Sequence, residues 1–138
     1  MKTIFSQIID REIPSSIVYE DDLVIAFLDI TQATPGHTLV VTKVPYQNIF
    51  EVPEETLKHL FAVVQKLSKA IFKAFDAKGL NLLNNNMPEA GQTVFHYHVH
   101  IIPRYEKEEV TFKLTNHMST LNSDAYKKRA AMIIAALS

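Results

Sequence analysis

Three histidines alternate with apolar residues in the stretch Phe95-His96-Tyr97-His98-Val99-His100-Ile101-Ile102-Pro103. This alternation is typical of a half-buried β-strand, because successive side chains of a strand point to opposite faces. The pattern predicts a strand with three imidazoles on one face and the apolar side chains from Phe95 to Ile101 in a core. Pro103 cannot donate to a sheet ladder and predicts the end of the strand. Since a core does not need three titratable rings on its opposite face, we expect that face to be a functional site.

The segments around this stretch predict an α+β domain. Five strands are expected in a mainly antiparallel sheet, at residues 17–20, 23–28, 37–42, 80–84 and 95–102. A short helix is expected near residues 4–9, and a C-terminal helix at 124–137 with Ser123 as its N-cap. The apolar stripe of that last helix is Tyr126, Ala130, Ile133 and Leu137.

One long helix is expected to begin near Pro53 and to end at Lys78 and Gly79. Apolar residues recur in it at steps of three and four, which predicts one buried stripe. That stripe consists of Leu57, Leu60, Phe61, Val64, Leu67, Ile71 and Phe75.

Composition narrows the classes of function. A chain of 138 residues with 47% hydrophobic content fits one domain with a hydrophobic core. Its net charge of −1 argues against nucleic-acid binding through a basic surface. The absence of cysteine excludes disulfides and thiolate metal sites. The acidic and basic residues 10–12 come too early for a signal peptide, and no stretch approaches ~20 apolar residues. We therefore expect a cytoplasmic protein without a membrane span.

Three imidazoles on one strand face allow two kinds of chemistry. Neighbouring same-face positions lie ~6.6 Å apart, so a histidine pair could chelate a metal only with further ligands, for which His37, His59 and His117 are the candidates. His59 and His117 are expected at the surface. Alternatively, the middle ring His98 attacks phosphorus while its neighbours orient it and neutralise charge. The remaining interpretation is that the histidines are surface residues without a role.

The loop that precedes the histidines favours phosphate chemistry. Gly91 in this loop allows a close backbone approach, and successive N–H groups over residues 89–94 could hold a phosphate beside the imidazoles.

Residues 96–102, His-Tyr-His-Val-His-Ile-Ile, resemble the signature of the histidine triad (HIT) family, His-φ-His-φ-His-φ-φ with φ apolar, at every position. Other blocks resemble the Hint branch of that family in the same order, at residues 4–5, 8–14, 19–22, 26–30, 35–40 and 91–94. The tail resembles that of bacterial members. The resemblance implies a single HIT domain over residues 1–138, closest to the family over 1–104, and a homodimer whose two sheets join into one.

The resemblance also implies an enzyme without a cofactor that hydrolyses purine nucleoside 5′-phosphoramidates or adenylates at the α-phosphate. His98 would attack phosphorus to form a nucleotidyl-histidine, and water would release a nucleoside monophosphate of the AMP or GMP type. His96 would orient His98, and His37 would complete the histidine cluster. The phosphate would contact His100 and the loop residues Gly91, Gln92, Thr93 and Val94.

The remaining nucleotide contacts are implied in the same way. Asp29 would accept hydrogen bonds from the ribose hydroxyls. Asn85 stands where the family has an asparagine near the ribose and phosphate, and its neighbours Asn84 and Asn86 are the alternatives. The base pocket would be lined by Phe5, Ile8, Phe27 and Ile30.

The chain departs from the family at a zinc site that some bacterial relatives carry. Thr3 and Ser6 stand at its two cysteine positions, and Tyr46 at a histidine position, so no metal is expected. Thr93 stands where many members have serine. Three other functions stay open: a dinucleoside polyphosphate hydrolase that uses the same histidine, a purine nucleotide-binding regulatory protein with little turnover, and a metal-dependent hydrolase.

Overall fold

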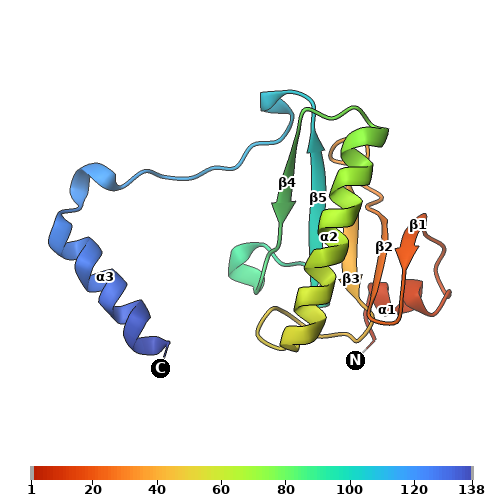
Figure 1. Cartoon of the computed structure of the whole chain (residues 1–138), viewed down its shortest axis with the longest axis horizontal. Helices are drawn as coiled ribbons and strands as arrows, with labels where there is room; N and C mark the ends of the chain where they lie inside the picture. The colour runs from red at the N-terminus through yellow and green to blue at the C-terminus, as the bar shows by residue number, and fades with distance from the viewer. Residues whose placement is uncertain (1, 138) are drawn as a thin grey trace.

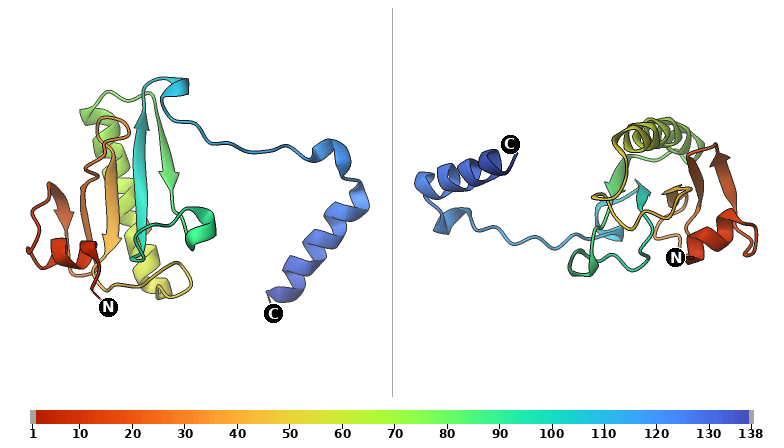
Figure 2. Two further views of the ribbon diagram at one scale, coloured as in Figure 1. Left: turned by 180° about the vertical axis from the view of Figure 1, so that it is seen from behind. Right: turned by 90° about the horizontal axis from the view of Figure 1, so that it is seen from below.

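The computed structural model describes residues 2–137, in which a five-stranded antiparallel sheet carries one helix on each face (Figures 1 and 2). The five antiparallel strands confirm the predicted α+β class, and their order, which was not predicted, is β1-β2-β3-β5-β4. The strands are β1 (Ile17–Glu20), β2 (Val24–Leu28), β3 (Thr38–Thr42), β4 (Gly79–Leu83) and β5 (His98–Arg104). The helices are α1 (Ile4–Ile9), α2 (Glu54–Ala74) and α3 (Ser123–Ala136).

Side chains of the central strands alternate between two cores. On one face, Val24, Val40 and Val99 pack with residues of α2, and on the other face Phe27 and Leu39 pack with residues of α1. The right-hand view of Figure 2 shows α2 and α1 on opposite sides of the sheet. Because β5 contributes Val99 to the α2 side, its histidines face the α1 side.

The long helix α2 ends earlier than predicted. Its last residue is Ala74, and Asp76 then adopts a left-handed conformation with φ +52°, which turns the chain toward β4 before Gly79. The expected stop at Lys78 and Gly79 was therefore wrong, and Gly79 instead begins β4.

The buried stripe of α2 also differs in part from the prediction. Leu60, Val64, Leu67 and Ile71 are buried as expected, while Phe61 and Phe75 are exposed at its margins, and Leu57 is partly buried. Val63, which the stripe omitted, is buried instead. A stripe wide enough to cover a sheet includes positions that a narrow three-four pattern leaves out.

Two details of the histidine stretch correct the prediction. The strand β5 begins at His98, so His96 and the exposed Phe95 precede it. Pro103 lies within the strand and pairs with Leu80 of β4. Pairing with β3 ends at Ile101, so this part of β5 has a neighbour on one side only, where a proline is tolerated.

The C-terminal helix α3 lies apart from the sheet (Figure 1). Its N-cap is Asn122, whose side chain accepts from the Ala125 N–H, and not Ser123 as predicted. None of its described residues is buried, so the expected stripe faces no core within this chain. Within residues 2–137, no helix is both long and apolar enough to cross a membrane.

Candidate active site

A cavity of about 260 Å³ opens on the α1 side of the sheet, beside the histidine face of β5. It is bounded by α1, the end of β2, the loop before β5 and β5 itself. All of the predicted nucleotide contacts line it, together with two of the four predicted histidines. These residues are Phe5, Ile8, Phe27, Asp29, Ile30, Asn85, Gly91, Gln92, Thr93, Val94, His98 and His100.

The His98 ring is held in one tautomer. Its Nδ1 lies 2.6 Å from the carbonyl oxygen of His96, which can only accept, so Nδ1 carries the proton and Nε2 keeps its lone pair. The ring lines the cavity and packs edge-on against Phe5, with the ring centres 5.0 Å apart. Burial lowers the pKa of His98, although the His96 carbonyl opposes the shift. His98 is therefore a neutral imidazole with an available Nε2 at neutral pH.

His37 and His100 form a second ordered pair. The Ala33 N–H donates to Nδ1 of His37 at 3.2 Å, so the His37 proton lies on Nε2 and donates to Nδ1 of His100 at 2.9 Å. His100 must then carry its own proton on Nε2, where it can donate to a ligand in the cavity. Burial and the neighbouring rings of His98 and His37 lower the pKa of His100 to about 4.

Asp29 lies beside this pair, just after β2. Its Oδ2 is 3.6 Å from Nε2 of His37, and its Oδ1 accepts from both the N–H and the hydroxyl of Thr31. Burial raises the pKa of Asp29, but the Thr31 hydrogen bonds and the nearby histidines outweigh this effect and lower it overall. The carboxylate is thus charged and available as an acceptor at the cavity wall.

The fully buried His96 ring does not line the cavity. Its Nε2 donates to the Thr42 carbonyl at 2.6 Å, so its Nδ1 accepts from the Thr3 hydroxyl, also at 2.6 Å. Thr3 in turn caps α1 by accepting from the Ser6 N–H. The ring of His96 therefore links α1 to the sheet, and its backbone carbonyl, rather than its ring, orients His98.

The loop before β5 is shaped by Gly91 and Gln92. Gly91 has φ +93°, a conformation that favours glycine. The Gln92 side chain accepts from the Met87 N–H and donates to the carbonyls of Gln47 and Val94. Because its side chain is used in these bonds, Gln92 holds the loop in place and does not face a ligand. The Gly91 and Gln92 N–H groups are bonded within the loop as well, so Thr93 and Val94 are left to contact a ligand.

The three consecutive asparagines have different positions. Asn84 donates to the His98 carbonyl, and Asn86 binds Asn84 and the Ile49 N–H. Asn85 is the member that lines the cavity.

Ile30 also lines the cavity, but it is 95% exposed and forms a rim rather than a buried surface.

Asp29, His37 and His100 are the described residues whose ligand atoms cluster closely enough to hold a metal, within 4.8 Å of one another. The two facing ring nitrogens of this cluster are, however, joined by their own hydrogen bond. The other candidate ligands lie elsewhere: His59 contacts Asp21 at 2.6 Å, and His117 is exposed in the tail.

Sequence reasoning missed part of the cavity wall. Ile4, Ile13, Pro14, Ser15, Leu28 and Leu39 also line it. Ile13 and Pro14 lie beyond the turn that follows α1, and their place at the cavity was not predictable without knowing where the chain turns back. Leu39 belongs to the same sheet face as Phe27, so strand alternation could have identified it.

Comparison with known proteins agrees with this geometry. The family model described as HIT domain matches residues 10–107. Protein hit of Bacillus subtilis is 55% identical over 104 residues, which are 75% of this chain and 72% of that protein. The Arabidopsis thaliana adenylylsulfatase HINT3 is 39% identical over 105 residues, which are 76% of this chain and 53% of that protein.

A solved structure extends the likeness to the tail. The crystal structure of a HIT family member from Bacillus subtilis has a TM-score of 0.94 and 43% identity, and the match covers 100% of this chain and 99% of that one. The antiparallel sheet and the cavity lined by His98 and His100 define a protein of the histidine triad class. This chain belongs to the HIT family.

Proposed function

We propose that this protein is a nucleotide hydrolase that cleaves purine nucleoside 5′-phosphoramidates or adenylates at the α-phosphate. The observation that carries the proposal is the state of His98: a neutral ring in a cavity, with Nδ1–H fixed on the His96 carbonyl and Nε2 unprotonated. An imidazole in this state is a nucleophile toward phosphorus. The name of the adenylylsulfatase relative supports an adenylate among the substrate classes.

The reaction then proceeds in two displacements. Nε2 of His98 attacks the α-phosphorus, the bond from phosphorus to the leaving amine or oxyanion breaks, and the leaving group takes a proton from solvent. The resulting imidazolium keeps its Nδ1 proton on the His96 carbonyl, which stabilises the positive charge. Water next attacks the same phosphorus and loses a proton to solvent, and the bond from phosphorus to Nε2 breaks. The nucleoside monophosphate is released, and His98 returns to its neutral form.

The neighbouring groups stabilise the phosphate charge. The His100 ring is set to donate from Nε2, because its Nδ1 accepts from His37. The Gly91 and Gln92 N–H groups donate to the Pro88 and Met87 carbonyls within the loop. The N–H groups of Thr93 and Val94 and the Thr93 hydroxyl border the same cavity and supply the further donors. The apolar walls from Phe5, Ile8 and Phe27, with Ile30 at the rim, suit a purine ring, and Asp29 suits the ribose hydroxyls.

The β4 edge supports the homodimer as part of this proposal. Within residues 2–137, β4 pairs with β5 on one side only, and its Leu82 is 53% exposed. An unpaired strand edge with an apolar side chain favours pairing with another chain. We therefore propose that two β4 strands meet and join the sheets of two copies.

The test is hydrolysis of an adenosine 5′-phosphoramidate with an amine leaving group, in the presence of a chelator. Wild type is expected to turn over, and His98→Ala to lose at least about 1000-fold in kcat while it still binds AMP. Loss of wild-type activity in chelator would favour the metal-dependent hydrolase. AMP binding without turnover by wild type would favour a regulatory protein or, if diadenosine polyphosphates are cleaved instead, the polyphosphate hydrolase.

A further inference from the structure

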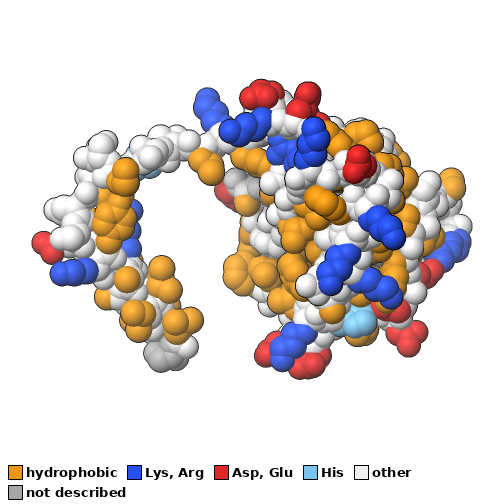
Figure 3. Space-filling view, turned by 45° about the horizontal axis from the view of Figure 1, so that its top comes forward, with side chains coloured by type: hydrophobic (Ala, Val, Ile, Leu, Met, Phe, Trp, Pro, Cys, Tyr) orange, Lys and Arg blue, Asp and Glu red, His pale blue; other side chains and the backbone are white. Residues whose placement is uncertain are grey.

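The turn after β5, residues 104–110, contains two kinds of side chain. Residues 106–108 are exposed, and the space-filling view shows acidic and basic side chains together where the chain leaves the sheet toward α3 (Figure 3). A charged, exposed turn is ordinarily solvated and needs no further explanation. Arg104 and Tyr105 are only partly exposed and are bonded to other segments of the chain. These two residues therefore attach the turn to the rest of the fold.

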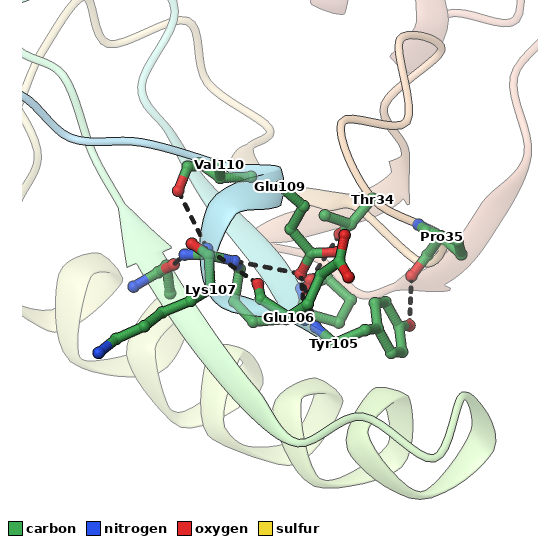
Figure 4. A network of polar contacts seen from close by, with 10 residues as sticks. Thr34, Pro35, Tyr105, Glu106, Lys107, Glu109 and Val110 are labelled. Carbon is green, nitrogen blue, oxygen red and sulfur yellow. Dashed lines mark hydrogen bonds and ion pairs between the residues drawn. The ribbon is translucent and has the colours of Figure 1, made fainter.

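Tyr105 is held at both its backbone and its hydroxyl (Figure 4). Its N–H donates to Oε1 of Glu109 at 2.5 Å, and the same oxygen accepts from Nε of Arg104 at 3.3 Å. Its hydroxyl donates to the Pro35 carbonyl at 2.6 Å. Pro35 belongs to the β2–β3 loop, residues 29–37, which also contains the cavity residue Asp29 and the histidine that bonds His100. Tyr105 thus joins the end of β5 to a loop of the active site.

A second hydroxyl reaches β5 from the β2–β3 loop itself. Thr34 is only 1% exposed, and its hydroxyl donates to the Pro103 carbonyl at 2.6 Å (Figure 4). Gly36, with φ +95°, lies so close to β5 and α2 that a Cβ there would be 3.2 Å from Pro103 and 3.0 Å from the Phe75 ring. Pairing of β3 with β5 ends at Ile101, so these contacts take the place of strand pairing at this end of the sheet.

Inside the β2–β3 loop, the Gln32 side chain holds the backbone together. Its Nε2 donates to the carbonyls of Asp29 and His37 at 2.6 and 2.7 Å, and its Oε1 accepts from the Gly36 N–H at 2.9 Å. Gln32 itself has φ +41°, a left-handed conformation that is unfavourable for a residue with a side chain. Because of these bonds, we expect the loop to move as one unit, so that a shift where it meets β5 also displaces Ala33.

The N–H of Ala33 decides how the two histidines are protonated. It donates to Nδ1 of His37 at 3.2 Å, at the upper end of the hydrogen-bond range, so a shift of about 0.5 Å breaks it. Asp29 lies 3.6 Å from Nε2 of His37, too far to hold the proton there by a hydrogen bond. Without the Ala33 bond, His37 can carry its proton on Nδ1 and accept from Nδ1 of His100. Nε2 of His100 would then lack a proton and would repel a phosphate oxygen.

We propose that Thr34 and Tyr105 are positioning residues of the active site, because they hold the β2–β3 loop where the Ala33 N–H keeps the proton of His100 on Nε2. This inference rests on the proposed hydrolase and adds to it two residues outside the cavity. Neither of them lines the cavity, and both bond only backbone carbonyls through their hydroxyls. They act through the tautomers of the His37–His100 pair and not on the substrate.

The first test observes the ring protons directly. Long-range ¹H–¹⁵N spectra of the ¹⁵N-labelled full-length protein at neutral pH distinguish protonated from unprotonated ring nitrogens. Wild type is expected to show His37 and His100 each with the proton on Nε2. Thr34→Val and Tyr105→Phe each remove one hydroxyl and are expected to show both rings as mixtures of two tautomers. Wild-type ring signals in both variants would overturn the proposal.

The second test separates positioning from a general loss of packing. Thr34→Val and Tyr105→Phe are expected to lower kcat on the phosphoramidate about 5-fold or more, while the dissociation constant of AMP stays within about 2-fold of wild type, because a small displacement of a group that stabilises the transition state costs rate. Thr34→Ser keeps the hydroxyl and is expected to restore the wild-type kcat and ring signals.

The matched control is Tyr19→Phe. It removes a tyrosine hydroxyl that donates to Asp21 at 2.7 Å, on the α2 side of the sheet, and is expected to behave as wild type in both tests. A fall in kcat as large as that of Tyr105→Phe would show that any such hydroxyl matters and would contradict the proposal.

The two tests also separate this inference from the proposed function. If wild type binds AMP without hydrolysing the phosphoramidate, the hydrolase is wrong, and the ring signals still decide whether Thr34 and Tyr105 set the tautomers. If the ring signals change in Thr34→Val while kcat stays at the wild-type value, the tautomers do not matter for hydrolysis and the positioning role is overturned.

Discussion

The body of this chain, residues 2–110, and its C-terminal arm, residues 111–137, differ in how far they bury their apolar side chains. In the body, Leu60, Val99 and Phe27 are buried between the sheet and its two helices. In the arm, Leu114 and Ile133 of comparable hydrophobicity face solvent. Both regions have regular secondary structure, so helix formation alone does not distinguish them. The difference shows that the body contains its own core, whereas the arm is not packed on its own chain.

The largest effect that can test this difference is the loss of a core side chain. Leu60→Ala is expected to lower the free energy of unfolding by about 2–5 kcal/mol at any protein concentration, because it leaves a cavity beneath α2. Leu114→Ala makes the same chemical change at a side chain that is 89% exposed in this chain. Its effect on the free energy of unfolding in urea is expected to be within about 0.5 kcal/mol, because this side chain is not buried in the body. Equal, concentration-independent losses in both variants would remove the distinction.

The histidine cluster makes the body sensitive to acid. Since the pKa of His100 is lowered to about 4 from 6.5, the unfolded chain binds more protons between these values. Stability is therefore full above about pH 6.5 and is lost as the pH falls toward 4, by about 2 kcal/mol from His100 alone after allowance for its partial exposure. Burial lowers the pKa values of His37, His96 and His98 as well, which adds to the loss.

The measurement is urea unfolding between pH 4 and pH 8, together with the initial rate of hydrolysis. The rate is expected to fall on the acid side only below the ordinary histidine pKa, where His98 becomes protonated. A stability that rises as the pH falls below 6.5 would contradict the assignment of neutral rings.

A smaller effect is expected where α1 is attached to the sheet. Thr3→Val removes the hydroxyl that donates to Nδ1 of His96 and that caps α1, at a cost of about 1–2 kcal/mol of unfolding free energy. Thr111→Val, which makes the same change at an exposed position in the arm, serves as the control and is expected to have almost no effect. If both variants unfold alike in urea, the link between Thr3 and His96 does not stabilise the body.

Much of the body could be predicted from strand and helix periodicity. The alternation around His98 placed its imidazole and that of His100 on one face and Val99 on the other, because a strand whose two faces meet different surroundings specifies its own register. The ends of elements were predicted less well. The stop of α2 depends on a left-handed Asp76, and the continuation of β5 through Pro103 depends on which neighbour each end of the strand has.

The site was predictable as a set of residues and less so as a set of contacts. The resemblance identified the twelve predicted residues that line the cavity. Residue identity alone does not tell that the backbone oxygen of His96 contacts His98, or that the Gln92 side chain binds within the loop. The arm was predicted least well. The apolar stripe expected on α3 is not buried in this chain, and Met132 and Ile134 outside that stripe are exposed apolar residues as well.

The central claim is that His98 becomes covalently attached to the nucleotide. The most direct measurement is to mix wild type with an adenosine 5′-phosphoramidate, quench in alkali during turnover, and search its peptides by mass spectrometry for an added adenylyl group. An adenylyl group on His98, absent from His98→Ala, is expected, together with retention of configuration at a chiral phosphorus after two displacements. Turnover without an adduct and with inversion at phosphorus would show direct attack by water and contradict the account.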